Sequence, residues 1–158
     1  MAIVVSFQVL EHVANPHEFI VSCLKLLRPG GKLVVGVPSH DGIFGRAVNS
    51  ILDMPPHHLT HWSKCTFQKL ADIFGLVLEE VQYEPIAAYH LKWARKIIWE
   101  NRVRDLTGLS YRVLDVRIRS RVVAKISSIM ASLFPPRVDS YTGHTMVVVF
   151  RKKGGELT

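Results

Sequence analysis

The sequence predicts an α/β fold with a mostly parallel sheet, and three observations carry that prediction. Apolar residues make up 48% and charged residues 21% of the 158 positions, which is typical of a globular domain with its own core. Two runs rich in β-branched residues, 3–7 and 32–38, lack polar alternation, as strands buried on both faces do. A helical pattern between them completes a βαβ unit with a right-handed crossover.

The helix of this unit has clear start and stop signals. Asn15, Pro16 and Glu18 supply an N-cap, a first-turn proline and a capping acid. The sequence Arg-Pro-Gly-Gly at 28–31 ends the helix before the second strand begins.

The remaining chain alternates helical and extended patterns. Residues 39–62 predict a long loop with one helical turn near 44–52, and long loops of this kind are often functional. Ser63 caps a predicted helix that stops at Gly75. The later predicted elements are a strand at 76–83, helices at 86–106 and 112–134, and a strand at 145–150.

Cysteine content and charge bound the class of protein. Two cysteines, Cys23 and Cys65, are too few for a disulfide framework, and the sequence has neither a secretory leader nor an 18-residue apolar span. A reduced, cytoplasmic protein is therefore expected. The formal charge of +7 is concentrated in residues 92–137, which hold eleven Lys/Arg against three Asp/Glu. Residues 1–91 hold six Lys/Arg against eight Asp/Glu, so the basic excess belongs to the two later helices.

Three segments carry a family resemblance: Phe-Gln-Val-Leu-Glu-His-Val at 7–13, Leu-Arg-Pro-Gly-Gly-Lys-Leu at 27–33, and Pro-Pro-His-His-Leu-Thr-His-Trp-Ser at 55–63. In these segments the sequence resembles the class I S-adenosylmethionine-dependent methyltransferases, most closely their ubiquinone-type (type 11) group. The resemblance implies an incomplete Rossmann-like methyltransferase sheet, mostly parallel with an antiparallel last strand. It implies a single partial domain over 1–158, with a sheet core at 2–83 and 144–151 and a basic helical insertion at 86–137.

The front half of that family's domain has no counterpart in these 158 residues. In the family, a first strand leads into an E/D-x-G-x-G turn that approaches the cofactor, and this motif is absent here. Gly30 and Gly31 precede a strand, so we expect them to form a turn and not a cofactor cradle. We therefore expect a truncated domain that binds S-adenosylmethionine weakly or not at all. The strand at 2–8 would lie at a sheet edge, which predicts a homodimer or a complementing chain there.

The resemblance also assigns candidate cofactor-binding residues. It implies that Ser6, Phe7, Gln8 and Val9 line the methionine end of S-adenosylmethionine. Sheet packing and a β-turn are the alternative interpretation of the same residues.

Polar residues near that turn and in the long loop are the candidates for catalysis. Glu11 and His12 would hydrogen-bond the turn backbone and the next helix, or face the substrate, and we favour the structural role for Glu11. The resemblance places the loop with His57 and His58 at the mouth of the substrate pocket, where a histidine can act as a general base. We predict that His58 and His12 are catalytic and that His57 and Trp62 bind the substrate. No metal site is expected, because adjacent histidines point in different directions and no acid or thiol stands at a regular spacing.

The two basic helices are the remaining functional feature. Their cations and the aromatic residues Trp93, Trp99 and Tyr111 suit an anionic membrane surface, or the phosphates of a nucleic acid or a nucleotide-linked substrate. A solvated basic face on helices packed against the sheet is the other interpretation. The contributing cations are Arg95, Lys96, Arg102, Arg104, Arg117, Arg119, Arg121 and Lys125. The second helix also has Leu114, Ile118, Val122, Ile126, Ile129 and Leu133 on one side.

The leading hypothesis is a truncated methyltransferase whose full-length form transfers a methyl group from S-adenosylmethionine to a small or lipid-like acceptor. One alternative is a non-catalytic binding or assembly module that completes or regulates another chain. Another is a basic, membrane-peripheral protein that binds anionic surfaces, whereas nucleic acid is disfavoured as a partner.

Overall fold

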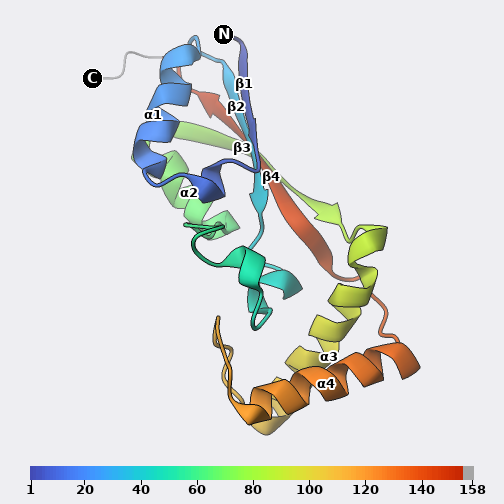
Figure 1. The fold of residues 1–158 in the computed structure, drawn as a ribbon. Coiled ribbons are helices and arrows are strands. Elements are labelled where there is room, and N and C mark those ends of the chain that lie inside the picture. The colour runs from blue at the N-terminus through green and yellow to red at the C-terminus, as the bar shows by residue number, and fades with distance from the viewer. Residues whose placement is uncertain (155–158) are drawn as a thin grey trace. The chain divides into compact units, whose positions relative to one another are not determined.

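The computed structural model describes residues 1–154. In order, the chain forms β1 (Ile3–Phe7), α1 (Pro16–Leu26), β2 (Lys32–Pro38), α2 (Lys64–Ile73), β3 (Leu76–Pro85), α3 (Leu91–Thr107), α4 (Ile118–Leu133) and β4 (Thr142–Lys152) (Figure 1). Short 3₁₀ helices lie at Leu10–His12, Ile43–Arg46, Ile51–Asp53 and Ala88–His90. The predicted α/β order is confirmed.

The chain divides into two compact units. Within the described residues, the sheet unit comprises Met1–Ser39, Pro55–Tyr83 and residues 145–154, and the helical unit comprises His40–Met54 and Glu84–His144. Each unit has its own cluster of buried apolar residues. A single partial domain with a helical insertion remains our prediction for the organisation of the chain.

The sheet has the strand order β1-β2-β4-β3. β1 pairs with β2 in parallel, with Ile3 opposite Lys32, and β2 pairs with β4 antiparallel, with Leu33 opposite Phe150. The arrows in Figure 1 show that β3 runs in the direction of β1 and β2. The predicted mixed sheet, mostly parallel with an antiparallel last strand, is confirmed.

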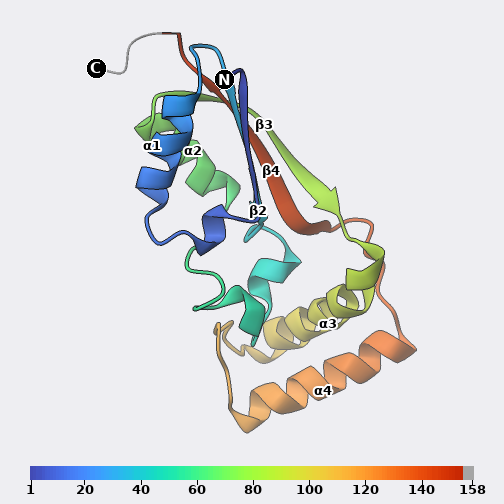
Figure 2. The same ribbon diagram turned by 45° about the horizontal axis from the view of Figure 1, so that its top comes forward.

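The core of the sheet unit lies on one face of the sheet. Both α1 and α2 lie on that side in two views (Figures 1 and 2). Their apolar residues pack against alternate positions of the strands, including the buried Leu33, Val35 and Val37 of β2. These contacts remove apolar surface from water, which is the main stabilising term of the unit.

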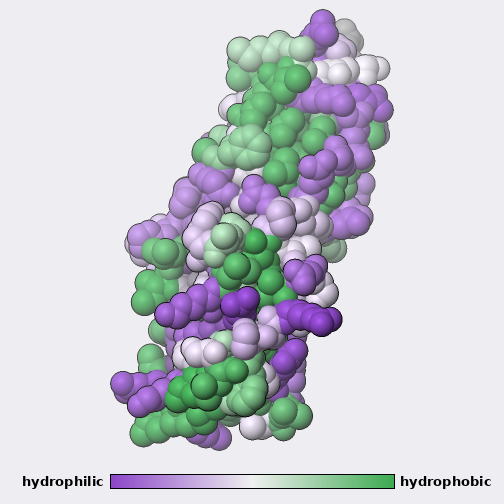
Figure 3. Space-filling view, turned by 90° about the vertical axis from the view of Figure 1, so that its right-hand side faces the viewer, coloured by the Kyte–Doolittle hydropathy of each residue, from purple (hydrophilic) through white to green (hydrophobic). Residues whose placement is uncertain are grey.

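The opposite face of the sheet is open at β1. Ile3, Val5 and Phe7 are each more than half exposed, and Figure 3 shows an apolar band on this side, bordered by polar residues. The expectation that the first strand is buried on both faces is therefore wrong for the described residues, because neither α1 nor α2 covers this side.

Capping side chains set the helix ends in the sheet unit. Asn15 Oδ1 accepts the N–H of Glu18 at 3.3 Å, and Ser63 Oγ accepts the N–H of Thr66 at 3.1 Å. Gly75 follows α2 with a left-handed backbone (φ 60°). The sequence signals for these ends are confirmed.

In the helical unit, α3 and α4 lie side by side (Figures 1 and 2). Both helices start later than the predicted 86 and 112, at Leu91 and Ile118. The second start is delayed because Asp115 Oδ1 accepts the N–H of Arg117 at 3.2 Å, which holds this stretch in a turn. Gly108 ends α3 with a left-handed backbone (φ 67°).

Candidate functional site

The turn after β1 lies at the carboxyl ends of the parallel strands. Gln8 has a left-handed backbone (φ 52°), and its N–H donates to the carbonyl of Gly36 in β2 at 2.8 Å. The Phe7 ring lies against Gly36, where an added Cβ would come within 2.1 Å of Phe7 Cδ1. Phe7 and Val9 are 52% and 42% exposed, whereas Ser6 is buried. The turn therefore presents an open apolar surface at the edge where open α/β sheets bind ligands.

Glu11 lies in the 3₁₀ turn that comes next, and its side chain is 1% exposed. Neither carboxylate oxygen accepts a hydrogen bond from the described residues. The structural role that we favoured, a side-chain hydrogen bond to the turn backbone, is therefore wrong. A buried carboxylate without such bonds is costly, so it needs a functional explanation.

The backbone of this turn anchors the histidine loop. The carbonyl of Glu11 accepts the N–H of Leu59 at 2.8 Å and that of Thr60 at 3.2 Å. Thr60 Oγ1 donates to the carbonyl of Leu10 at 3.3 Å. Two segments about fifty residues apart in sequence are thus fixed together at the end of the sheet.

The anchored loop brings the two predicted catalytic histidines together. The rings of His12 and His58 meet edge to face, with centroids 5.0 Å apart. His12 Nδ1 hydrogen-bonds the backbone carbonyl of His57, whose side chain is exposed. His12 Nε2 lies 3.8 Å from Glu11 Oε1. Glu11, His12 and His58 therefore form one cluster. The sequence did not predict this cluster, because it does not show how close the turn and the loop lie.

Trp62, predicted to bind substrate, packs inside the sheet unit. It is 6% exposed and stacks on Phe67, with ring centroids 5.0 Å apart. Its Nε1 donates to Thr60 Oγ1 at 2.9 Å. The side chain thus supports the loop that carries His58, and its contact with substrate stays a prediction.

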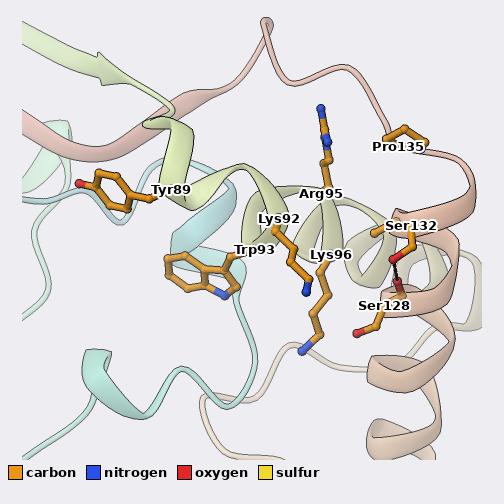
Figure 4. Close-up of a pocket in the computed structure, with 9 residues that line it drawn as sticks. Tyr89, Lys92, Trp93, Arg95, Lys96, Ser128, Ser132 and Pro135 are labelled. Carbon is orange, nitrogen blue, oxygen red and sulfur yellow. Dashed lines mark hydrogen bonds between the residues drawn. The ribbon is translucent and has the colours of Figure 1, made fainter.

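The helical unit contains a cavity of about 650 Å³ between α3 and α4 (Figure 4). It is lined by Tyr89, Lys92, Trp93, Arg95, Lys96, Ser128, Ala131, Ser132 and Pro135. Three of these residues are cationic and none is acidic, so the lining suits an anionic group beside an apolar one. Sequence reasoning named Trp93, Arg95 and Lys96 but missed Lys92, although Lys92 and Lys96 stand one helical turn apart.

Two of the predicted surface cations are instead paired within the helical unit. Arg104 is fully buried, 3.3 Å from Glu100 Oε1 and 3.8 Å from Asp115 Oδ2. Arg117 donates two side-chain hydrogen bonds to Asp115, from Nε to Oδ1 and from Nη2 to Oδ2, both at 2.7 Å. These hydrogen bonds hold the pKa of Asp115 well below its usual range. Both arginines stabilise the connection between α3 and α4 and are therefore not available to bind an external anion.

The apolar side of α4 faces solvent. Its buried positions are the small or medium residues Ser120, Val123 and Ser127. The exposed apolar stripe of α4 consists of Ile118, Val122, Ile126, Ile129 and Leu133, which are 46–78% exposed, and Figure 3 shows apolar surface at the level of this helix. Arg121 and Lys125 are exposed beside it. None of the helices within residues 1–154 is long and apolar enough to span a bilayer.

The parallel strands with helices on one face, and a turn with polar side chains at their carboxyl ends, define a Rossmann-like α/β domain. A family model described as "Methyltransferase domain" matches residues 1–81, about half of the sequence, and the chain belongs to this family. The family implies S-adenosylmethionine as the methyl donor.

Individual relatives agree with this assignment. Over 32 residues the chain is 50% identical to a ubiquinone biosynthesis O-methyltransferase of Maricaulis maris, a match that covers 20% of this chain and 13% of that enzyme. The solved structures include a protein of Bacillus halodurans assigned as a methyltransferase, with a TM-score of 0.53 and 17% identity. They also include the YcgJ protein of Bacillus subtilis, with a TM-score of 0.53 and 11% identity. Each alignment covers 98% of this chain and 65% of the neighbour, and at this identity the likeness concerns the fold alone.

Proposed function

We propose that this chain is part of a methyltransferase that transfers a methyl group from S-adenosylmethionine to a small or lipid-like acceptor. The observation that carries the proposal is the open turn at 6–9, which lies beside the anchored histidine loop at the carboxyl ends of β1 and β2. Methyl transfer by displacement at a sulfonium depends mainly on positioning the two reactants, and a rigid sheet edge suits that task.

The residues of the turn fit one end of the cofactor. Phe7 and Val9 offer apolar surface, Gln8 offers an exposed amide, and Ser6 Oγ is buried without a hydrogen-bond partner among the described residues. The paired glycines do not add a cradle, because the N–H of Gly30 is bonded to the carbonyl of Lys152 at 3.0 Å. The exposed turn residues support binding of the methionine end of the cofactor. Because the glycines add no cradle, we expect this chain to bind the whole cofactor only weakly.

The histidine cluster follows directly on the turn at 6–9, so the acceptor would bind beside this cluster. His12 and His58 have imidazole nitrogens that can accept a proton from an acceptor hydroxyl or amine. His57 is exposed in the same loop and would contact the acceptor directly. Trp62 would act indirectly, since its side chain holds the loop through the hydrogen bond to Thr60.

Weak cofactor binding is best tested by a nuclear magnetic resonance titration of the ¹⁵N-labelled chain with S-adenosylhomocysteine. We expect shifts at millimolar ligand that are confined to the amides of residues 6–12 and their neighbours in β2. Phe7→Ala should reduce these shifts, whereas Leu26→Ala, an exposed change on α1, should not. ATP serves as the adenine control. The absence of shifts, or shifts only in the helical unit, would contradict the proposal, and low-micromolar affinity would contradict the expected weakness.

A second candidate function, binding to an anionic membrane surface, is supported by α4. Its exposed apolar stripe is too extensive for a helix that only supports the fold, and Arg121 and Lys125 border it. Such a helix lying in the interface would bring the chain close to a lipid-like acceptor, and the cationic cavity between α3 and α4 suits an anionic headgroup.

Vesicle flotation tests this second function. We expect the chain to float with phosphatidylcholine vesicles that contain phosphatidylglycerol, and to remain unbound with phosphatidylcholine alone. The double variant Val122→Ser/Ile129→Ser should abolish flotation, and the control Ile73→Ser, at a still more exposed apolar site on α2, should not. Equal flotation of both variants would remove the proposal.

A protein partner at β1 is the third element of the proposal. β1 lies at the sheet edge and exposes Ile3, Val5 and Phe7. An edge strand with an apolar face favours pairing with another chain, so we propose a second copy or a complementing chain at this edge.

A further inference from the structure

The carboxylate of Glu11 is buried without a hydrogen-bond partner among the described residues. It is 1% exposed, and both oxygens lack hydrogen bonds from the described residues. Burying an ionised carboxylate without compensation carries a large desolvation penalty, and a bound cation is one group that offsets this penalty.

The neighbouring imidazole has the arrangement of a metal ligand. His12 Nδ1 hydrogen-bonds the carbonyl of His57. A carbonyl only accepts, so Nδ1 carries the proton and the neutral ring keeps its lone pair on Nε2. Nε2 is the atom that lies 3.8 Å from Glu11 Oε1. A backbone carbonyl that fixes the tautomer in this way is typical of histidines that bind metals.

The third ligand comes from the anchored loop. Ligand atoms of Glu11, His12 and His58 all lie within 4.8 Å of one another. An ion with bonds of about 2.0–2.2 Å needs neighbouring ligand atoms about 3–3.5 Å apart. Because His12 is about half exposed and His58 is only partly buried, small ring rotations can close the remaining gap. The two backbone hydrogen bonds from Leu59 and Thr60 to Glu11 keep the loop in place during this closure.

We infer that Glu11, His12 and His58 bind one divalent transition-metal ion, of which Zn²⁺ is the probe of choice. Two imidazoles and a carboxylate are a ligand set suited to zinc, iron, cobalt or manganese and not to calcium. Three protein ligands leave at least one coordination position for water or another oxygen ligand. This inference goes beyond the proposed function, and it replaces our expectation that the histidines bind no metal. The ion and a transferred proton compete for the same lone pairs, so His12 and His58 act as bases only in the metal-free chain.

Metal binding can be measured on the purified chain without cofactor or acceptor. The chain, made without a polyhistidine tag and stripped with a chelator, is titrated with Zn²⁺ by calorimetry and with Co²⁺ by visible absorption. We expect one ion per chain. Glu11→Gln and His58→Gln should each weaken binding at least about tenfold. The matched control is His57→Gln, which removes an adjacent exposed imidazole but keeps the carbonyl that orients His12, and it should bind as the wild type does.

Thermal unfolding supplies a second measurement that does not depend on affinity alone. Zn²⁺ should raise the Tm of the wild type and of His57→Gln, but not that of Glu11→Gln. Without metal, Glu11→Gln should unfold at or above the wild-type Tm, because a neutral amide is cheaper to bury than an unpaired carboxylate. No zinc binding at micromolar free metal, or equal binding by all variants, would overturn the inference. Neither outcome bears on the cofactor titration, which tests the proposed function separately.

Discussion

Asn49 and Asp115 are joined by two hydrogen bonds across 66 residues of sequence: Asn49 Oδ1 accepts the N–H of Asp115 at 2.8 Å, and Asn49 Nδ2 donates to the carbonyl of Asp115 at 3.0 Å. One amide side chain thus satisfies both backbone groups of a residue in the α3–α4 connection. Asn49 has a left-handed backbone (φ 60°), a conformation that asparagine tolerates better than most residues.

Replacing Asn49 should therefore destabilise the helical unit. We expect Asn49→Ala to lower the free energy of unfolding by about 2 kcal/mol, since both hydrogen bonds are lost and alanine is strained in the left-handed region. Asn49→Gly loses the same bonds without that strain and should cost roughly 1 kcal/mol less. Urea denaturation followed by circular dichroism measures both, and equal stability of the two variants would show that backbone strain plays no part.

The lowered pKa of Asp115 should make the stability of the helical unit depend on pH in acid. Hydrogen bonds from Arg117 hold its pKa below the ordinary value of about 3.9, so the ionised form stabilises the fold above that value. The stabilisation is lost as the pH falls through the lowered pKa of the folded state. The Tm of Asp115→Asn should lie below that of the wild type at pH 7, and the difference should shrink steadily below about pH 4. Asp139→Asn, an exposed control, should follow the wild type throughout. A pH-independent difference would contradict this assignment.

Tyr111 should titrate at unusually high pH. Desolvation of its hydroxyl, and the hydrogen bond that it donates to Asp105 at 2.6 Å, raise the pKa of Tyr111 to about 12. Absorbance at the tyrosinate band should therefore show a late component that Tyr111→Phe removes. Asp105→Asn should move that component to lower pH, since the charged acceptor is gone. Circular dichroism of the same samples checks that the chain is still folded.

Pairing through the β1 edge should respond to a single charge. Val5 is 54% exposed on the open side of the edge strand, and a lysine there would oppose pairing. We expect light scattering to give twice the 17.9 kDa chain mass for the wild type and the monomer mass for Val5→Lys. Leu26→Lys, equally exposed on α1, should leave the dimer intact. A wild-type monomer at all concentrations would disprove self-association.

Local sequence signals were sufficient to predict most of the helices and strands. The N-cap residues Asn15 and Ser63 and the left-handed Gly75 act within one helical turn of their own position, so a pattern of neighbours predicts them. The late start of α4 was missed because Asp115, whose carboxylate holds Arg117 in a turn, is itself fixed by Asn49, a partner far away in sequence. The predicted burial of β1 failed for a related reason, since burial depends on which segments cover a sheet face.

The sequence by itself determined the α/β class and the order of strands and helices, because hydrophobic periodicity and helix-end signals are local properties. The two histidines of the candidate site were predicted from the family resemblance of their segments. Tertiary structure alone decided that Glu11 is buried beside His12 and His58, and that the apolar side of α4 faces solvent. Both outcomes follow from contacts between distant segments: the loop at 57–60 is hydrogen-bonded to the turn at 10–12, and α4 packs on α3 through its small residues. A helical pattern gives the direction of each side chain around its own axis, but only the neighbouring segment decides which direction is inside.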